Sequence, residues 1–232
     1  TPEELEEMRE KQIANDEAPR YDGRCRNLTE EERKELEAEG REAVIRFKSP
    51  ANEQEIIIND LVHGKVSFSS DVIDDFVIVK SDGMPTYNFA VVIDDHLMEI
   101  SEVIRGEDHL SNTPKQKLLY QAFGWTSPNF AHLPMILGSD RSKLSKRSGE
   151  AYVYVSEYRK KGYLPEAVVN FLSLLGWSPT DDEEIFSKEE IIDRFSMDRV
   201  NKSAAVFDVE KLDWMNGLYI RNKDLETIVD LA

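Results

Sequence analysis

The sequence predicts a mixed α/β fold, and three observations along its 232 residues carry that prediction. Apolar alternations spaced about ten residues apart, within 44–68, are typical of short strands. A helix opened by Pro114 at its first turn is followed by an apolar stretch around Leu133 to Leu137, which indicates a helix leading to a buried strand. Beyond Ser148 the pattern is mostly helical.

The N-terminal segment, to about residue 40, is strongly acidic and predicts two helices. The first runs from Pro2 to about Asn15, and the second from Thr29 to about Glu39. Thr29 and Glu32 have the spacing of a capping box, in which each side chain bonds the backbone N–H of the other residue. A turn-rich segment at 19–23 separates the two helices.

Short strands follow the two helices. The alternating residues are Val44, Arg46, Ile56, Ile58, Val66 and Phe68. The run from Phe76 to Val79, followed by Asp82-Gly83, predicts a buried strand that ends in a turn.

The later elements combine helices with one further strand. An apolar run continues through Ile93, and a helix is predicted from about Thr113 to Phe123. Leu164-Pro165 opens another helix, whose apolar residues are Val168, Val169, Phe171, Leu172, Leu174 and Leu175. Further helices are expected after the capping residues Ser187, Asp208 and Asp224.

Composition limits the class of protein. No run approaches the roughly 18 apolar residues that span a bilayer, and the first residues lack the order of a signal peptide, so we expect no membrane association. The single cysteine, Cys25, fits a reducing cytoplasm. The formal net charge of −17 repels nucleic acids, including DNA, at long range and opposes their unspecific binding, so any RNA contact must be local. Such a basic patch lies between Arg141 and Tyr163, although a solvated surface has the same composition.

Three motifs carry chemistry. The segment Lys143-Leu144-Ser145-Lys146-Arg147 places three cations on a short loop, which suits neutralisation of a triphosphate. Most basic pentapeptides are simply solvated surface, so this segment indicates phosphate binding only in combination with other motifs. Two precede it: the segment 83–95, which contains Pro85-Thr86-Tyr87-Asn88-Phe89, and Val103-Ile104-Arg105-Gly106-Glu107-Asp108-His109. A Walker-type phosphate loop, a dinucleotide Gly-x-Gly-x-x-Gly and a Gly-x-Ser-x-Gly elbow are missing.

The order and spacing of these motifs resemble those of bacterial-type glutamyl-tRNA synthetases, which are class I aminoacyl-tRNA synthetases. The resemblance covers essentially the whole chain, including a Trp214-Met215-Asn216-Gly217 turn. It implies an inserted acceptor-stem-binding α+β domain at 1–85, the second half of a Rossmann-like catalytic domain at 86–140, and a helical stem-contact domain with the lysine loop at 141–232. The family's His-Ile-Gly-His-like turn is missing, so we expect an internal fragment, without the anticodon-binding domain and inactive alone.

The implied reaction is ATP-dependent ligation of glutamate to the 3′ end of tRNA(Glu) through a glutamyl-adenylate, with tRNA needed for activation. The implied partners are tRNA(Glu), L-glutamate and ATP with Mg²⁺, in a cytoplasmic enzyme that we expect to be a monomer. Glutaminyl-tRNA synthetase and a glutamyl transferase acting on a modified tRNA nucleoside are alternatives with the same motif order. A non-catalytic acceptor-stem-binding module is an alternative of another class. Charging of tRNA(Gln) is left open, because the anticodon reader is outside the chain.

The resemblance assigns roles to the lysine loop. Lys146 is expected to stabilise charge on the ATP phosphates, with Lys143 and Arg147 assisting, and Gly149 gives the loop freedom to close. An exposed surface lysine is the alternative interpretation of Lys146.

Two residues are expected to bind glutamate. The Arg105 guanidinium can bind a planar carboxylate through two parallel hydrogen bonds. The alternative for Arg105 is an ion pair with Glu99, Glu102 or Asp108. Tyr87 would set its hydroxyl against the amino acid, unless it is a buried core tyrosine.

The nucleotide has its own candidates. Asp108 is at the position of an acidic residue that contacts ATP, and His109 is expected near the adenine, although a lone histidine is often structural. Main-chain groups at Ile136 or its neighbour are expected to bind the adenine.

Metal binding is not expected in this chain. His109 invites a metal interpretation with Asp94, Asp95, His96 and Asp108, but the spacing does not fit a structural zinc site. Some bacterial relatives bind zinc through a pair of cysteines and a further cysteine near the position of Cys25. The cysteine pair would lie outside this chain, and Asn27 occupies the position of a fourth ligand.

Overall fold

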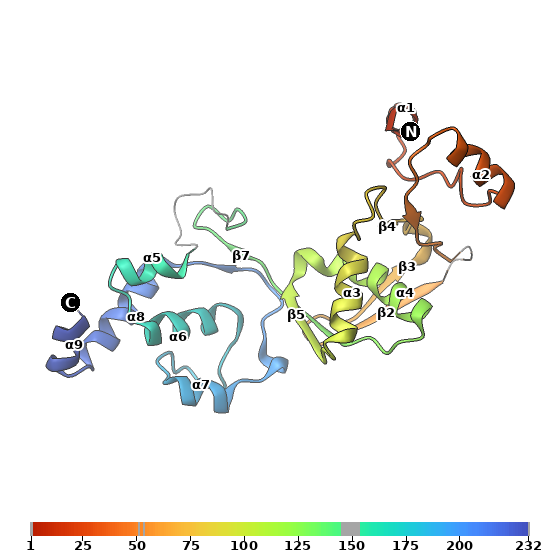
Figure 1. The fold of residues 1–232 in the computed structure, drawn as a ribbon. Helices are drawn as coiled ribbons and strands as arrows, with labels where there is room; N and C mark the ends of the chain where they lie inside the picture. The colour runs from red at the N-terminus through yellow and green to blue at the C-terminus, as the bar shows by residue number, and fades with distance from the viewer. Residues whose placement is uncertain (1, 51, 53, 145–153, 232) are drawn as a thin grey trace. The chain divides into compact units, whose positions relative to one another are not determined.

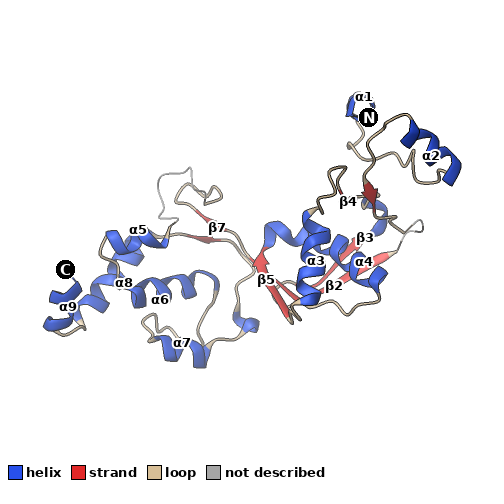
Figure 2. Ribbon diagram, in the orientation of Figure 1, coloured by secondary structure: helices blue, strands red, loops and turns tan. Residues whose placement is uncertain are grey.

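The computed structural model describes residues 2–50, 52, 54–144 and 154–231. It divides into two compact units, which are described separately (Figure 1). Unit 1 comprises residues 1–59, 65–103 and 110–129, and unit 2 comprises residues 60–64, 104–109 and 130–232. Both units contain helices and strands, so the predicted mixed α/β class is confirmed (Figure 2). This division leaves the three predicted domain boundaries as predictions.

The N-terminal helices form where capping predicts them. Helix α1 covers Pro2–Ala14 and α2 covers Glu30–Ala38. The Thr29 side chain accepts the Glu32 N–H, and the Glu32 carboxylate accepts the Thr29 N–H at 2.8 Å, so the capping box is complete.

A buried ion pair anchors the segment after α1. Asp75 is paired with Arg26 and accepts the Ser49 N–H at 2.9 Å, while Arg26 donates to the Ser49 carbonyl at 2.7 Å. The guanidinium of Arg46 lies 3.8 Å from the centre of the Tyr21 ring. These bonds hold residues 21–26 beside β1 (Ile45–Arg46) and β4 (Val77–Val79), which pair antiparallel.

The main sheet has four strands in the order β3-β2-β6-β5. Strand β2 covers Glu55–Asp60, β3 Gly64–Ser69, β5 Glu102–Gly106 and β6 Asn129–Leu133. Strands β2 and β6 are parallel, with Asp60 opposite Phe130. Polar side chains at the ends of β2, β5 and β6 therefore come to neighbouring positions in the sheet.

The strand expected around Leu133 to Leu137 is instead two strands. Strand β6 ends at Leu133, and β7 (Ile136–Leu137) pairs in parallel with β8 (Ala205–Val206). Pro134 lies between them, and it has no N–H to continue the ladder.

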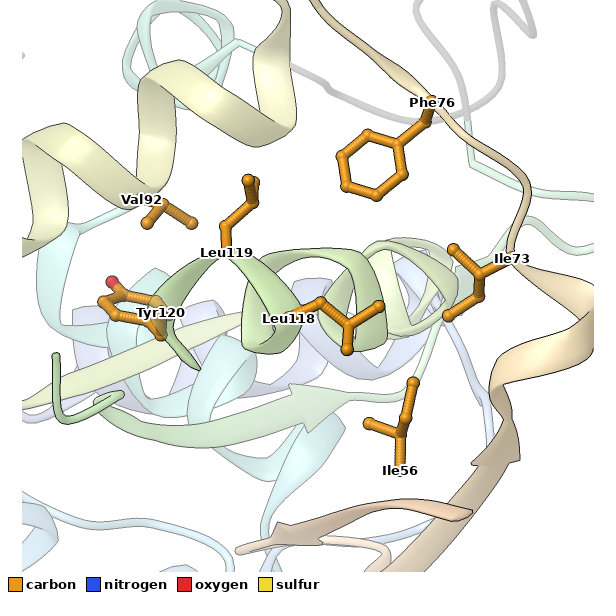
Figure 3. Packing of buried hydrophobic residues seen from close by; sticks show 7 residues of the cluster. All are labelled: Ile56, Ile73, Phe76, Val92, Leu118, Leu119 and Tyr120. Carbon is orange, nitrogen blue, oxygen red and sulfur yellow. The ribbon is translucent and has the colours of Figure 1, made fainter. Parts of the chain in front are cut away.

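The core of unit 1 lies between β2 and two helices. Helix α3 (Tyr87–Leu97) contributes Val92, and α4 (Thr113–Phe123) contributes Leu118, Leu119 and Tyr120. The cluster drawn in Figure 3 consists of these four residues with Ile56, Ile73 and Phe76. Helix α4 has Pro114 in its first turn, as predicted, and ends at Gly124, whose φ of 70° suits a residue without Cβ.

The helices of unit 2 are α5 (Val155–Lys160), α6 (Pro165–Gly176), α7 (Lys188–Arg194), α8 (Val209–Arg221) and α9 (Leu225–Leu231). Helices α7, α8 and α9 follow the predicted capping residues Ser187, Asp208 and Asp224, and α6 starts at the predicted Pro165. Ser187 forms a capping box with Glu190, and Asp208 accepts the Lys211 N–H at 3.0 Å. Their core contains Phe171 and Leu175 of α6 together with Leu212 and Met215 of α8.

The prediction of a turn at Trp214-Met215-Asn216-Gly217 is wrong, because these residues lie inside α8. Leu212 and Met215 are three residues apart, so they share a helix face, and both are fully buried. The Asn216 side chain accepts the Leu164 N–H at 2.8 Å and thereby links α8 to the start of α6. Among the described residues, no helix combines the length and apolar composition needed to cross a membrane.

The helical assignment of 214–217 makes a stability prediction. Met215→Ala should lower the free energy of unfolding by about 2–5 kcal/mol, since it opens a cavity in the core of unit 2. Trp214→Ala, on the same helix but 48% exposed, should cost clearly less. Urea denaturation of both variants measures this, and equal losses would contradict the orientation of α8.

Candidate active site

Three polar side chains from neighbouring strands form a row in unit 2, and two of them are fully enclosed. The Arg105 Nε donates to the His132 Nε2 at 3.1 Å, and the His132 Nδ1 lies 2.6 Å from the Asp60 Oδ2. The side chains of His132 and Asp60 are completely shielded from solvent. A guanidinium only donates, so Nε2 must be the acceptor and the ring proton must lie on Nδ1. The row is therefore carboxylate, imidazole, guanidinium.

The backbone around Asp60 stabilises its charge. The Val62 and His63 N–H groups donate to Oδ1 at 2.9 Å, and the His132 N–H donates to Oδ2 at 3.2 Å. Burial alone would raise the pKa of Asp60, but the bonds from His63, His132 and Val62 outweigh it, and the pKa is lowered.

His132 is correspondingly neutral. Burial lowers its pKa, and the positive charge of Arg105 lowers it further, whereas the bond to Asp60 opposes both effects. Near neutral pH the row therefore carries one negative and one positive charge, separated by an uncharged ring.

Alternation along β6 gives its residues different surroundings. Phe130 and His132 point to the same side, with ring centres 6.2 Å apart and 15° between the ring planes. Ala131 points to the other side, where it packs with Val62 and Val200. The Arg105 guanidinium carbon lies 5.7 Å from the centre of the Phe130 ring, within the range of a cation–π contact. Arg105 is thus held by two side chains of the neighbouring strand.

The turn after β5 brings two of the motifs together. The Lys143 Nζ donates to the Asp108 Oδ2 at 2.8 Å, and this bond lowers the pKa of Asp108. A Cβ on Gly106 would lie 2.6 Å from the Asp108 Oδ1, so a side chain there would require the Asp108 carboxylate to shift. A basic group and an acidic group from separate motifs therefore meet on the surface of unit 2.

The main chain at Ile136 is fixed from both sides. Its carbonyl accepts the Leu144 N–H at 3.1 Å, and Glu107 accepts the Met135 N–H at 3.1 Å. His63 lies near the same carboxylate, with its Nε2 3.7 Å from the Glu107 Oε2. A carbonyl oxygen has a second lone pair, so these bonds leave Ile136 able to accept another donor.

The structure shows where the predicted residues and several of their proposed partners lie. Tyr87 begins α3 in unit 1 and is 51% exposed, so it is not a buried core tyrosine. Among the acids considered for Arg105, Asp108 is bonded to Lys143, and Glu102 accepts hydrogen bonds from Ser101 and Asn129. His109 lies partly buried in the 3-10 turn Glu107–Asn112, which leaves its proposed role open.

The catalytic assignments of Lys146 and Arg147 lie outside the described residues, as does Gly149. Within the described part of the chain, no three His, Cys, Asp or Glu side chains are arranged to hold a metal ion. His96, one of the residues considered for a metal, stacks on Trp125 with ring centres 3.7 Å apart.

A cleft of about 510 Å³ lies elsewhere in unit 2, between α6 and the segment leading into α8. Its lining includes Phe171, Leu175, Lys202, Ser203, Asp208 and Lys211 and none of the predicted site residues. Asp60, Arg105, Asp108 and Lys143 are not among its lining residues, so we assign it no role.

Sequence reasoning missed Asp60 and His132. Two signals were present: a carboxylate directly after the apolar run 56–58, and a histidine inside the apolar stretch 130–133. Their pairing across 72 residues depends on β2 and β6 being neighbours, which the sequence does not state.

Comparison with known proteins identifies the family. The family described as "tRNA synthetases class I (E and Q), catalytic domain" matches residues 1–214. The chain belongs to this class I synthetase family. Relatives of this class I chain named "Glutamate--tRNA ligase" are 59% identical in Natranaerobius thermophilus and 60% identical in Carboxydothermus hydrogenoformans, over all of this chain.

Solved structures of class I synthetases agree with the fold. The glutamate–tRNA synthetase of Elizabethkingia anophelis matches 99% of this chain and 51% of its own, with a TM-score of 0.87 and 42% identity. A glutamate–tRNA ligase of Elizabethkingia meningosepticum, solved in complex with its amino acid, matches with the same TM-score. The class I chain spans about half the length of the curated relatives it matches.

The Asp108–Lys143 bond makes a prediction about ionisation. Lys143→Met should raise the pKa of Asp108 towards its ordinary value, because the hydrogen bond to Lys143 is the largest cause of its depression. Carboxyl-carbon NMR titration measures the change. Lys223→Met is the matched control, since it should raise the pKa of Glu166 and leave Asp108 unaffected. An unchanged Asp108 titration after loss of Lys143 would show that the two groups do not pair in solution.

Proposed function

We propose that the whole protein ligates glutamate to the 3′ end of tRNA(Glu), using ATP to form a glutamyl-adenylate. One observation carries the proposal: the lysine loop and the Gly-Glu-Asp-His turn meet in a bond between Lys143 and Asp108. An α-carboxylate and ATP are both negatively charged, so their reaction needs cations beside the phosphates. The name "Glutamate--tRNA ligase" of the relatives favours glutamate over glutamine as the amino acid.

In the proposed reaction, a carboxylate oxygen of glutamate attacks the α-phosphorus of ATP, and the bond to pyrophosphate breaks. Negative charge then grows on the bridging and non-bridging oxygens. Lys146 is assigned to this charge, with Lys143 and Arg147 assisting. Asp108 holds Lys143 until ATP arrives, when phosphate oxygens can replace the carboxylate as the lysine's partner.

Binding of the substrates is assigned to further residues. Arg105 and Tyr87 bind glutamate, while Asp108, His109 and the main chain at Ile136 contact ATP. Mg²⁺ would be held mainly by the phosphates, with carboxylates near ATP supporting it indirectly. It would neutralise phosphate charge when bound.

The domain assignment forms part of the same proposal. Residues 1–85 would bind the tRNA acceptor stem, 86–140 would complete the nucleotide-binding fold, and 141–232 would contact the stem. We propose a cytoplasmic monomer. A non-catalytic RNA-binding module is the rival, and glutamate-dependent ATP–pyrophosphate exchange with tRNA(Glu) present separates it from a ligase. Exchange by the whole protein supports the ligase, and tRNA binding without exchange supports the module.

Loss of Lys146 should affect chemistry more than binding. Lys146→Ala in the whole protein should slow adenylate formation roughly a hundredfold while glutamate affinity stays within a few-fold, because one contact to developing charge is lost. Single-turnover kinetics measures this step. Lys188→Ala, which removes an exposed lysine at the start of α7, should leave the rate unchanged. An unaltered rate in the Lys146 variant would remove this residue from the mechanism.

Loss of Arg105 should affect recognition. The Arg105→Gln variant should lose most of its activity with glutamate, and its preference for glutamate over glutamine should decrease. The reason is that the guanidinium is the proposed partner of the side-chain carboxylate. Values of kcat/KM for both amino acids measure the change. Arg194→Gln is the control, since Arg194 pairs with Asp181 and Glu183 away from the site. Full retention of the glutamate KM in the Arg105 variant would assign Arg105 a structural role.

A further inference from the structure

We propose that Asp60 and His132 are positioning residues for Arg105, and that they fix which of its nitrogens can receive the side-chain carboxylate of the substrate. This inference rests on the proposed function, in which Arg105 binds glutamate. It adds two residues, neither of which needs to touch the substrate.

The hydrogen bond to His132 restricts the guanidinium. A carboxylate can bind an arginine through Nε and one Nη, or through the two Nη atoms. In this structure the Nε proton is directed to the His132 Nε2 at 3.1 Å. A carboxylate that binds Arg105 while this bond is kept therefore uses the two terminal nitrogens, which restricts its direction of approach.

A neutral imidazole is well suited to this task. A carboxylate placed directly on Arg105 would neutralise it and compete with the substrate's own carboxylate. The imidazole orients the guanidinium through a single acceptor atom and adds no charge. The full charge of Asp60 remains on the far side of the ring, 2.6 Å from the His132 Nδ1.

Asp60 is needed because an imidazole has two tautomers. If the proton were on Nε2, two N–H groups would face each other and the bond to Arg105 would be lost. The Asp60 carboxylate accepts from Nδ1 and so keeps the proton there. Its own position is fixed by the N–H groups of Val62, His63 and His132.

Three substitutions separate positioning from simple core packing. Asp60→Asn preserves the side-chain volume, but its amide can donate to Nδ1 and thereby move the ring proton to Nε2. His132→Asn keeps a donor near Asp60 and has no acceptor at the position of Nε2. His132→Gln can place its amide oxygen near that position and so retain an acceptor for Arg105.

The experiment measures the KM values for glutamate and ATP in tRNA-dependent ATP–pyrophosphate exchange by the whole protein. Asp60→Asn and His132→Asn should raise the KM for glutamate roughly tenfold, because Arg105 loses the hydrogen bond that orients its guanidinium. The KM for ATP should not change, and His132→Gln should stay within a few-fold of the original protein.

Asp75→Asn is the matched control, because Asp75 is also buried and paired with an arginine but lies in unit 1. It should lower the melting temperature and leave the glutamate KM unchanged. The inference is overturned if the glutamate KM follows thermal stability across all four variants, or if Asp60→Asn and His132→Asn keep the original value. Absence of glutamate-dependent exchange in the unsubstituted protein would instead overturn the proposed function, and this inference with it.

Discussion

The buried carboxylate of Asp60 is the constraint on which the arrangement of the candidate site depends. A charge shielded from solvent must be balanced by hydrogen bonds, and Asp60 receives them from Val62, His63 and His132. These bonds fix the end of β2 beside β6 and set the tautomer of His132. The tautomer in turn determines that Arg105 is bound through Nε, so a single buried charge influences three strands.

The charges differ in how readily they can exchange partners. Asp60 is enclosed, whereas Asp108 and Lys143 are exposed and pair with each other. An exposed ion pair contributes little to stability, so a phosphate can replace the carboxylate at small cost. Arg105, in contrast, is oriented by the uncharged ring of His132. The enclosed row provides orientation, and the exposed pair provides exchangeable charge.

Local signals in the sequence predicted much of the fold. Thr29 and Glu32 formed the expected capping box, and Pro114 opened α4, because caps and first-turn prolines act within a few residues. Two errors arose from tertiary context: Pro134 divided an expected strand, and packing of α8 kept Gly217 inside a helix. The motifs made Arg105, Asp108 and Lys143 candidates for the site, but not Asp60 and His132. Their pairing depends on strand order, which local periodicity does not contain.

The protonation state of His132 tests the central claim most directly. Nitrogen-15 NMR of the protein labelled at histidine distinguishes the two ring nitrogens, and His132→Gln assigns the signal by its loss. The account predicts a neutral ring near neutral pH, with the proton on Nδ1 and an unprotonated Nε2 bonded to Arg105. A ring protonated at Nε2, or a doubly protonated ring, would contradict it, because neither could accept the Arg105 N–H.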